Sequence, residues 1–176
     1  MDKNIVDLRS DLYDCEYNNN RNKEKYNQCL FSENINISDV YLVDPKYDSI
    51  SLSKVINNTK LIYRFFGSSC VQCIEDELDI AKQLADSIGA NNIVIISDYN
   101  NINMLSAIIK RKNITSSYFI FNKKFELLIE DDEQAIPSFF LLDANLRTRF
   151  VFKTGGHQNI ADPYYRRIIW FFKNGF

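Results

Sequence analysis

Two cysteines stand two residues apart where an apolar segment gives way to a helical pattern. Cys70 and Cys73 form a Cys-x-x-Cys motif, and the small residues 67–69 separate it from the apolar run 61–66. A helix that begins here places Cys70 in its first turn, where unpaired backbone N–H groups and the positive end of the helix dipole stabilise a thiolate. Such cysteines have pKa values of roughly 3.5 to 7.5, compared with about 8.5 for a free thiol. The motif therefore predicts a redox-active dithiol, with Cys70 as the exposed attacking thiol and Cys73 as the buried resolving thiol.

Two other uses of a Cys-x-x-Cys pair compete with redox chemistry. The pair can be half of a zinc site, but the sequence has no second such motif and His157 is its only histidine. Structural zinc sites need four ligands, so we expect no bound metal. The cysteines can also be redox-inert core residues, and the residue types alone leave that alternative open.

The elements that must position the dithiol alternate along the chain. Strand patterns are found at residues 40–43, 49–52, 61–66, 93–96, 118–121, 138–143 and 147–153. Helical patterns are found at residues 53–57, 71–87, 102–112 and 161–172, the last with Trp170 expected in the core. Strands that alternate with helices imply parallel pairing, while the first two and last two strands are spaced as hairpins. We therefore expect an α/β fold with a central mixed sheet and helices on both faces.

Composition limits the classes of protein to consider. The chain has 176 residues, 45% of them hydrophobic and 14% aromatic, which suits one globular domain with a substantial core. The net charge is −2 without long blocks of either sign, so we expect no nucleic-acid partner. No run of eighteen apolar residues is present, so we expect no membrane-spanning segment. The first ten residues lack the apolar region of a signal peptide, which leaves either a cytosolic protein or an exported one whose signal is absent from this sequence.

The first 36 residues differ from the rest of the chain. They are rich in Asn, Asp and Lys, and we interpret residues 1–36 as an N-terminal extension and residues 37–176 as the main domain. A disordered leader is the alternative. The extension carries Cys15 and Cys29, which could form a structural disulfide worth roughly 3 kcal/mol in the chain-entropy model. Free surface thiols, or a second dithiol that exchanges with Cys70, stay open as alternatives.

Two motifs together resemble a known family. Residues 40–77, with the sequence Phe65-Phe66-Gly67-Ser68-Ser69-Cys70-Val71-Gln72-Cys73 at their centre, resemble the thioredoxin-like superfamily of TlpA-like proteins and thiol peroxidases. The segment Ile136-Pro137-Ser138-Phe139-Phe140-Leu141-Leu142-Asp143 is similar to that family's cis-proline and following strand, and Lys153-Thr154-Gly155-Gly156 to its glycine turn before the last helix. The resemblance extends over about residues 37–172.

The resemblance implies a thioredoxin-like fold and a thiol–disulfide oxidoreductase, specifically a TlpA-like disulfide reductase. Pro137 is expected to be cis and to lie beside the dithiol, where Ile136 presents backbone groups to an extended substrate; an ordinary trans proline at a strand start is the alternative. Ser69, Val71 and Gln72 are expected to contact the substrate as well.

The family resemblance also bears on partners and location. The expected partners are a disulfide-containing protein substrate and a dithiol protein that donates electrons, and no cofactor is expected beyond the redox-active disulfide. The cell envelope or periplasm is the expected location, with the cytoplasm as the alternative. A non-catalytic thioredoxin-fold module that binds proteins or peptides is the main alternative function.

Three departures from the family pattern qualify these expectations. Ser69 and Gln72 replace the usual aromatic and proline beside the cysteines, and Arg64 stands where many thioredoxins have a buried acid. We interpret Arg64 as the partner of Glu75 or Glu77 in a structural ion pair, with electrostatic stabilisation of a thiolate as the alternative. A peroxidase is a minor alternative only, because Gly67 occupies the position of the peroxiredoxin threonine.

The turn after the dithiol is acidic. Glu75, Asp76 and Glu77 suit the positive end of a helix dipole, which is the structural explanation for them. Negative charge there also opposes a nearby thiolate. We therefore hypothesise that Cys70 is less acidic than the cysteines of strong oxidants and that the pair is comparatively reducing.

Overall fold

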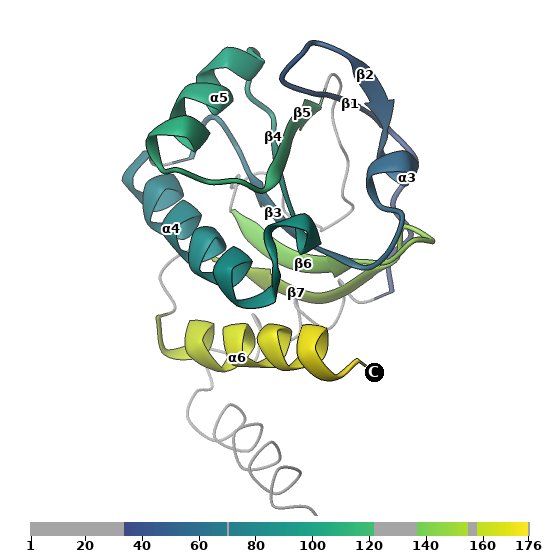
Figure 1. The fold of residues 1–176 in the computed structure, drawn as a ribbon, viewed down its shortest axis with the longest axis vertical. Helices are drawn as coiled ribbons and strands as arrows, with labels where there is room; N and C mark the ends of the chain where they lie inside the picture. Colours follow the sequence, from purple (N-terminus) through teal and green to yellow (C-terminus); the bar gives the residue numbers. More distant parts are fainter. Residues whose placement is uncertain (1–33, 70, 122–136, 155–157, 176) are drawn as a thin grey trace, which may run out of the picture.

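A seven-stranded mixed sheet forms the centre of the protein (Figure 1). The computed structural model describes residues 34–69, 71–121, 137–154 and 158–175, with side chains of the last range from residue 163 onward. The strand order is β2-β1-β5-β4-β3-β6-β7. Strands β3, β4 and β5 are parallel to one another, whereas β1, β2, β6 and β7 join the sheet by antiparallel pairs.

The bounds of the elements follow the predicted pattern closely. The strands are β1 Tyr41–Val43, β2 Ser49–Ser51, β3 Lys60–Phe65, β4 Ile93–Ser97, β5 Ser117–Phe121, β6 Ser138–Leu142 and β7 Thr148–Lys153. The helices are α3 Leu52–Val55, α4 Val71–Ile88, the 3-10 turn η1 Ala90–Asn92, α5 Ile102–Arg111 and α6 Gln158–Asn174. Both predicted hairpins and the predicted parallel pairs are confirmed. The last helix begins earlier than expected, at Gln158 rather than Ala161.

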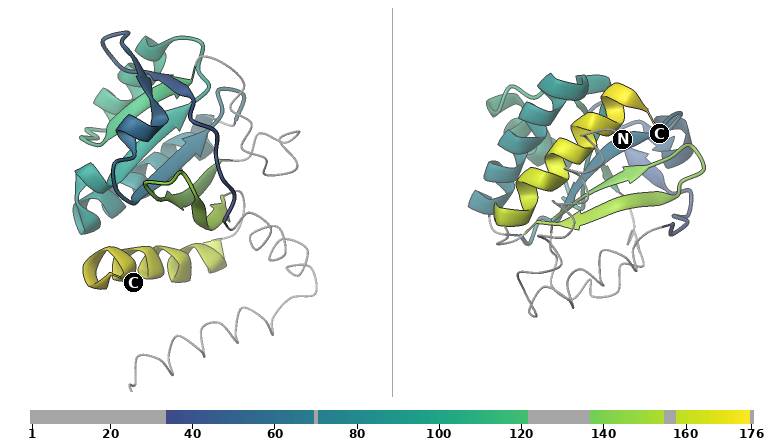
Figure 2. Two further views of the ribbon diagram at one scale, coloured as in Figure 1. Left: turned by 90° about the vertical axis from the view of Figure 1, so that its right-hand side faces the viewer. Right: turned by 90° about the horizontal axis from the view of Figure 1, so that it is seen from below.

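The three long helices cover one face of the sheet. The crossovers through α4 and α5 proceed in the same direction across the sheet, from β3 to β4 to β5, so a common handedness puts both helices on one side. Buried residues of α4, α5 and α6 pack there in one cluster with alternate residues of β3, β4 and β6. Figure 2 shows α6 beside α4, in agreement with the contacts between them. Among the described residues, α3 is the only helix on the opposite face, so the expectation of helices on both faces holds only through this single turn.

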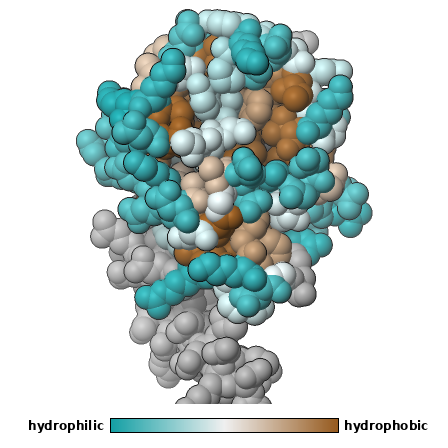
Figure 3. All heavy atoms as spheres, in the orientation of Figure 1, coloured by the Kyte–Doolittle hydropathy of each residue, from teal (hydrophilic) through white to brown (hydrophobic). Residues whose placement is uncertain are grey.

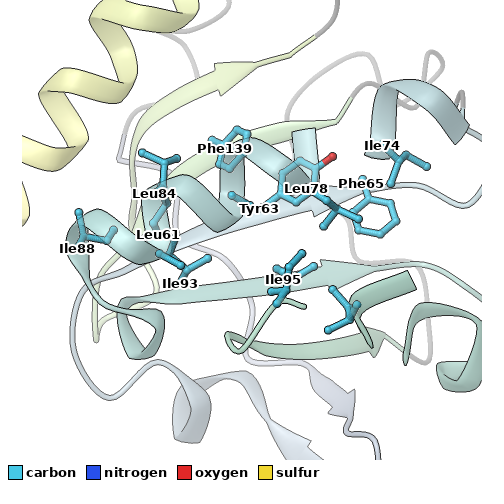
Figure 4. Close-up of a cluster of buried hydrophobic side chains, with 14 of the residues drawn as sticks. Leu61, Tyr63, Phe65, Ile74, Leu78, Leu84, Ile88, Ile93, Ile95 and Phe139 are labelled. Atoms are coloured by element: carbon cyan, nitrogen blue, oxygen red, sulfur yellow. The ribbon is translucent and has the colours of Figure 1, made fainter. Parts of the chain in front are cut away.

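Burial on both faces explains the apolar sequence of strand β3. Residues Leu61, Tyr63 and Phe65 of β3 face the long helices, as Figure 4 shows for this cluster. The alternate residues of β3 face the other side, where Ile62 joins the second cluster. A strand buried on both faces needs apolar side chains at nearly every position, which is the pattern of residues 61–66.

The position of Trp170 differs from the prediction. It was predicted to lie in the core, but its side chain is half exposed. The buried face of α6 is set by Ile168 and Phe171. Trp170 lies two positions from Ile168, a rotation of about 200° around the helix axis, and so points outward.

The last residues of the predicted extension pair with the main domain. Asn34 donates its backbone N–H to the Thr148 carbonyl at 2.8 Å, and Ile35 accepts the N–H of Thr148 at 3.0 Å. The predicted pair Cys15 and Cys29 lies outside the described residues, so its pairing stays a prediction. Within the described ranges, no helix has both the length and the apolar character to cross a membrane.

Candidate active site

Four connections meet at one edge of the sheet. The loop before α4 follows the end of β3, the residues Asp98 and Tyr99 follow the end of β4, Pro137 precedes β6, and Thr154 follows β7. The pairing register places these ends side by side, because Phe65 is opposite Ser97 and Ser138 is opposite Lys153. Carboxyl ends of parallel strands are the usual place for ligand sites in α/β sheets. The dithiol motif and the proline segment therefore meet at the edge where chemistry is expected.

The dithiol stands at the start of α4. Cys70 lies outside the described residues and directly precedes Val71, the first residue of the helix. Cys73 is in the first turn and is exposed, so its predicted burial is wrong. The buried face of α4 begins one residue later, at Ile74, and continues at Leu78. Each residue rotates by about 100° around the helix, which puts Cys73 at the border of that face.

A backbone anchor holds the loop that precedes the dithiol. The Gly67 N–H donates to Oδ1 of Asp98 at 2.5 Å, and the Ser69 N–H donates to the Phe66 carbonyl at 3.0 Å. A Cβ atom on Gly67 would lie 2.9 Å from Cδ1 of Tyr99. The absence of a side chain thus lets the loop approach Tyr99, whose ring packs edge-on against Phe65 at 5.7 Å between centroids.

The residues of the dithiol loop that were predicted to contact substrate lie at the surface. Val71 is 65% exposed, Gln72 is exposed, and Ser69 is partly exposed. The side-chain amide of Gln72 donates to Oδ1 of Asp76 at 2.7 Å, a bond within the first turns of α4. The structure thus brings these three residues to the same surface as Cys73. Their contact with a substrate stays a prediction.

The acidic turn after the dithiol divides into three different environments. Glu75 accepts a hydrogen bond from Arg111 and lies 3.8 Å from Nζ of Lys112, so cations at the end of α5 compensate its charge. Asp76 is exposed. Glu77 is half-buried and points toward α6, where the Tyr165 hydroxyl donates to its Oε2 at 3.3 Å. Of these three carboxylates, Asp76 is the exposed one, and the described residues give it the Gln72 amide but no cationic partner. Figure 3 shows hydrophilic side chains over the outer surface of α4 and α5.

Arg64 does not make the ion pair that we predicted. Its neighbours Tyr63 and Phe65 face α4, so Arg64 itself faces the other side of the sheet, away from Glu75 and Glu77. The side chain is buried, and its guanidinium lies 4.4 Å from the centroid of the Phe66 ring. Side chains alternate along a strand, and this alternation is the reason that the predicted pair cannot form.

Glu77 is a functional candidate that the sequence analysis treated only as a helix-dipole residue. It follows Cys73 by four positions, so the two side chains lie on the same side of α4, one turn apart. Burial raises the pKa of the Glu77 carboxyl, and the charge of Asp76 adds to this, while hydrogen bonds from Tyr165 and Thr154 act in the opposite direction. A raised pKa brings a carboxyl group closer in proton affinity to a thiol, which makes Glu77 a candidate for proton exchange with Cys73.

Tyr63 places a buried hydroxyl beneath the same turn. The residue is fully buried, and its hydroxyl has no hydrogen-bond partner among the described residues. In Figure 4 this hydroxyl points toward the end of α4 that carries Ile74. Burial raises the pKa of Tyr63 well above its ordinary value, and the negative charges of Glu77 and Cys73 contribute. The raised pKa therefore keeps the phenol protonated at neutral pH.

The proline segment is held by Thr154. The Thr154 backbone N–H donates to the Pro137 carbonyl at 2.8 Å, and the Thr154 hydroxyl lies 3.2 Å from the same oxygen. Ile136 lies outside the described residues, so the geometry of the Ile136–Pro137 peptide bond stays a prediction. Thr154 also lowers the pKa of the Glu77 carboxyl, against the larger effect of burial.

Sequence reasoning missed Glu77, Thr154, Tyr63 and Tyr165 as site residues. The four-residue spacing of Cys73 and Glu77 is a signal that could have found Glu77, because it predicts a common helix face. Tyr63 is a hydroxyl-bearing residue within an apolar strand, a weaker signal. Nothing in the sequence indicated that Tyr165 and Thr154, about ninety and eighty residues further along, reach the same point.

This architecture is a thioredoxin-like fold, as predicted. A thiol:disulfide interchange protein from Bacteroides sp. superimposes with a TM-score of 0.61 at 14% identity, over 81% of this chain and 91% of that one. The thioredoxin domain of a thiol-disulfide oxidoreductase from Bacteroides vulgatus gives 0.59 at 13% identity, over 79% and 96%. A peroxidoxin from Mycobacterium tuberculosis gives 0.52 at 14% identity, over 78% and 97%. No protein-family model matches the sequence, and comparison with curated proteins gives no match.

Proposed function

We propose that the protein is a thiol–disulfide oxidoreductase that uses Cys70 and Cys73. Within this class, we propose a TlpA-like disulfide reductase. The observation that carries this proposal is the position of Cys73. It is exposed in the first turn of α4, at the sheet edge that also holds Pro137, and a half-buried carboxyl group lies one helical turn away. Redox-inert core cysteines would be buried among apolar side chains, and Cys73 is not.

The proposed reaction transfers two electrons to a substrate disulfide. The Cys70 thiolate attacks one sulfur of that disulfide, which forms a mixed disulfide and releases the first substrate thiolate. Cys73 then attacks the Cys70 sulfur, releases the second substrate thiolate and closes the Cys70–Cys73 disulfide. Glu77 accepts the proton that Cys73 loses in this second step. A partner dithiol protein reduces the Cys70–Cys73 disulfide by the same exchange, so the cycle needs no further cofactor.

The proposed partners follow from this chemistry. The substrate is a protein with an exposed disulfide, bound in extended form across Ser69, Val71, Gln72 and the Ile136–Pro137 segment. We propose the cell envelope or periplasm as the location, because an oxidising compartment supplies disulfides to reduce; a cytoplasmic reductase is the alternative.

Insulin reduction tests the proposal. We expect turnover with a small dithiol as electron source, and its loss in Cys70→Ser. Cys73→Ser should trap the mixed disulfide, visible by mass spectrometry, because the resolving thiol is gone. Cys15→Ser tests the second cysteine pair: retained turnover would mean that Cys70 and Cys73 act without it, and lost turnover would mean that the Cys15–Cys29 pair takes part. If the wild-type protein forms no reversible Cys70–Cys73 disulfide, the proposal of an oxidoreductase is wrong. The alternative function, a non-catalytic thioredoxin-fold module that binds proteins or peptides, then replaces it.

The reduction potential separates a reductase from an oxidant. Equilibration with glutathione, read by alkylation and mass spectrometry, should give a value near that of thioredoxin, about −270 mV. A value near about −120 mV would make the protein an oxidant and contradict the hypothesis drawn from the acidic turn.

A further inference from the structure

The outward side of α6 combines a large apolar side chain with positive charge. Trp170 is 50% exposed, and Arg166, Arg167 and Lys173 are exposed as well. The three cations lie three or four positions from Trp170, so all four side chains share one side of the helix. No acidic residue occurs between positions 163 and 174. We call these four residues the outer α6 face.

No described element covers the outer α6 face. The buried side of the same helix is set by Ile168 and Phe171, which belong to the main core. Figure 1 shows α6 as the outermost described element on its side of the molecule. Among the described residues, no carboxylate lies within ion-pair distance of its three cations. A partner for this face must therefore supply negative charge together with apolar side chains.

The N-terminal extension joins the domain beside this face. Asn34, the first described residue, donates its backbone N–H to Thr148 at the start of β7. Two positions further along β7 stands Phe150, and the Arg167 guanidinium lies 4.3 Å from the centroid of its ring. Residues 1–33 lie outside the described residues, and they are attached to the domain at this point. The attachment holds them close to α6.

The first part of the extension has the complementary composition. Residues 1–17 contain five acidic and two basic residues, namely Asp2, Asp7, Asp11, Asp14 and Glu16, with Lys3 and Arg9. The acidic residues at positions 7, 11 and 14 recur at helical spacing. Ile5, Leu8 and Leu12 recur at helical spacing as well. This pattern is typical of a segment with an acidic side next to an apolar side.

We propose that residues 1–17 dock on the outer α6 face of their own chain. The apolar residues of the segment cover Trp170, and its acidic residues pair with the surrounding cations. Residues 18–33 connect the segment to Asn34 and can extend over at most roughly 50 Å, while α6 is only about 26 Å long. The connection is therefore long enough for the segment to reach any part of the face.

The covalent connection favours this partner over other acidic surfaces. Exposed ion pairs are individually weak, so a separate acidic partner would need a high concentration to bind. A segment joined to its binding surface by a short linker meets it at an effective concentration in the millimolar range. A separate affinity of only about 1 mM therefore keeps about half of the molecules docked.

The test measures acrylamide quenching of tryptophan fluorescence in the full chain. Trp170 is the only tryptophan, so the signal reports on the outer α6 face alone. In Asp7→Lys/Asp11→Lys/Asp14→Lys, the quenching constant should rise at least about twofold, because at least half of the molecules lose their cover. High salt should cause a rise in the unaltered protein as well, because salt screens exposed charges. The salt experiment needs no variant and stands even if the triple variant fails to fold.

Exchange of the charges tests the pairing itself. Arg166→Glu/Arg167→Glu/Lys173→Glu should raise the quenching constant as the acidic triple variant does. The combination of both triple variants should lower it again to the unaltered value, because the ion pairs re-form with opposite sign.

A matched control separates docking from a change of net charge. Asp48→Lys/Asp76→Lys/Asp86→Lys reverses three exposed acids of the main domain. It changes the net charge as much as the acidic triple variant does, and it should leave the quenching of Trp170 unchanged.

Three results would overturn the proposal. One is a quenching constant that is the same in the unaltered protein and in the acidic triple variant and does not respond to salt, which would leave the face open for another partner such as an anionic membrane. The second is a quenching constant that depends on protein concentration, which would mean that a second copy covers Trp170. The third is a charge exchange that does not restore the cover. None of these measurements involves thiol exchange, so they are independent of the proposed oxidoreductase activity.

Discussion

Replacing Tyr63 by phenylalanine removes one oxygen atom from the most buried part of the candidate site. The hydroxyl has no partner among the described residues, and an unsatisfied buried polar group costs about 1–3 kcal/mol. The ring contacts remain, because Phe139 stacks on Tyr63 at 4.6 Å between centroids and Phe65 packs at 5.4 Å. We therefore expect Tyr63→Phe to raise the free energy of unfolding by about 1 kcal/mol, at the lower end of that range.

Urea unfolding of the reduced protein measures this change. With a slope near 2 kcal/mol per molar urea, about 1 kcal/mol moves the midpoint upward by about 0.5 M while the slope stays constant. Tyr165→Phe is the matched control. It loses a hydroxyl that donates to Glu77, so its midpoint should fall. A Tyr63→Phe midpoint that falls as far as that of Tyr165→Phe would refute the reasoning, because it would mean that the hydroxyl is well hydrogen-bonded.

Alkaline pH supplies a second readout of the same residue. The pKa of Tyr63 is raised in the folded protein, so above pH 10 the unfolded chain releases this proton while the folded chain retains it. Stability is therefore lost as the pH rises above 10. In Tyr63→Phe this part of the alkaline loss should disappear. Equal alkaline losses in the two proteins would contradict the raised pKa.

Three further changes have defined outcomes. Gly67→Ala brings a methyl group to 2.9 Å from Tyr99, so we expect a loss of about 1–2 kcal/mol by urea unfolding and several-fold slower alkylation of the dithiol by iodoacetamide. Glu77→Gln should be more stable than wild type at pH 7 but not at pH 4. Because the pKa of Glu77 is raised in the folded state, the folded protein binds more protons than the unfolded chain above pH 4.5. The stability of the wild type therefore falls as the pH rises above 4.5, and Glu77→Gln lacks this loss. Asp39→Ala should destabilise the protein at pH 7 and progressively less as the pH falls below 3.8, because hydrogen bonds from Ser53 at 2.9 and 2.6 Å lower the pKa of Asp39 and stabilise its charged form.

Each of these changes has a neighbouring control. Ser68→Ala alters the same loop as Gly67→Ala at an exposed position and should leave alkylation unchanged. Asp76→Asn removes an exposed acid next to Glu77 and should not reproduce the pH-dependent gain. Asp48→Ala lies in the same hairpin region as Asp39 and should have little effect at either pH. If a control variant shows the same change as its test variant, the explanation given for that test variant is wrong.

Local patterns in the sequence were sufficient for the elements and for much of the fold. The apolar run 61–66 predicted a strand buried on both faces, because such a strand has no solvent-facing side to give an alternating pattern. The spacing of Ile74, Leu78 and Ala81 predicted α4 and its buried face. The alternation of strands with helices predicted the parallel pairs. These features depend on residues close in sequence, so a single sequence can reveal them.

The environment of each site residue depended on contacts that only the tertiary structure decides. Cys73 is exposed because the rotation of α4 against the sheet places Ile74 inward instead. Arg64 faces away from Glu75 because strand alternation outweighs charge complementarity.

The environment of Glu77 also depends on tertiary contacts, here with residues far away in the sequence. It is half-buried with a raised pKa because α6 brings Tyr165 to it from 88 positions further along the chain. The sequence by itself predicted a helix with Cys73 in its first turn at the edge of a mixed sheet. Long-range packing decided which acidic residue near the dithiol is buried and has a raised pKa, because burial and charge depend on every element that surrounds a group.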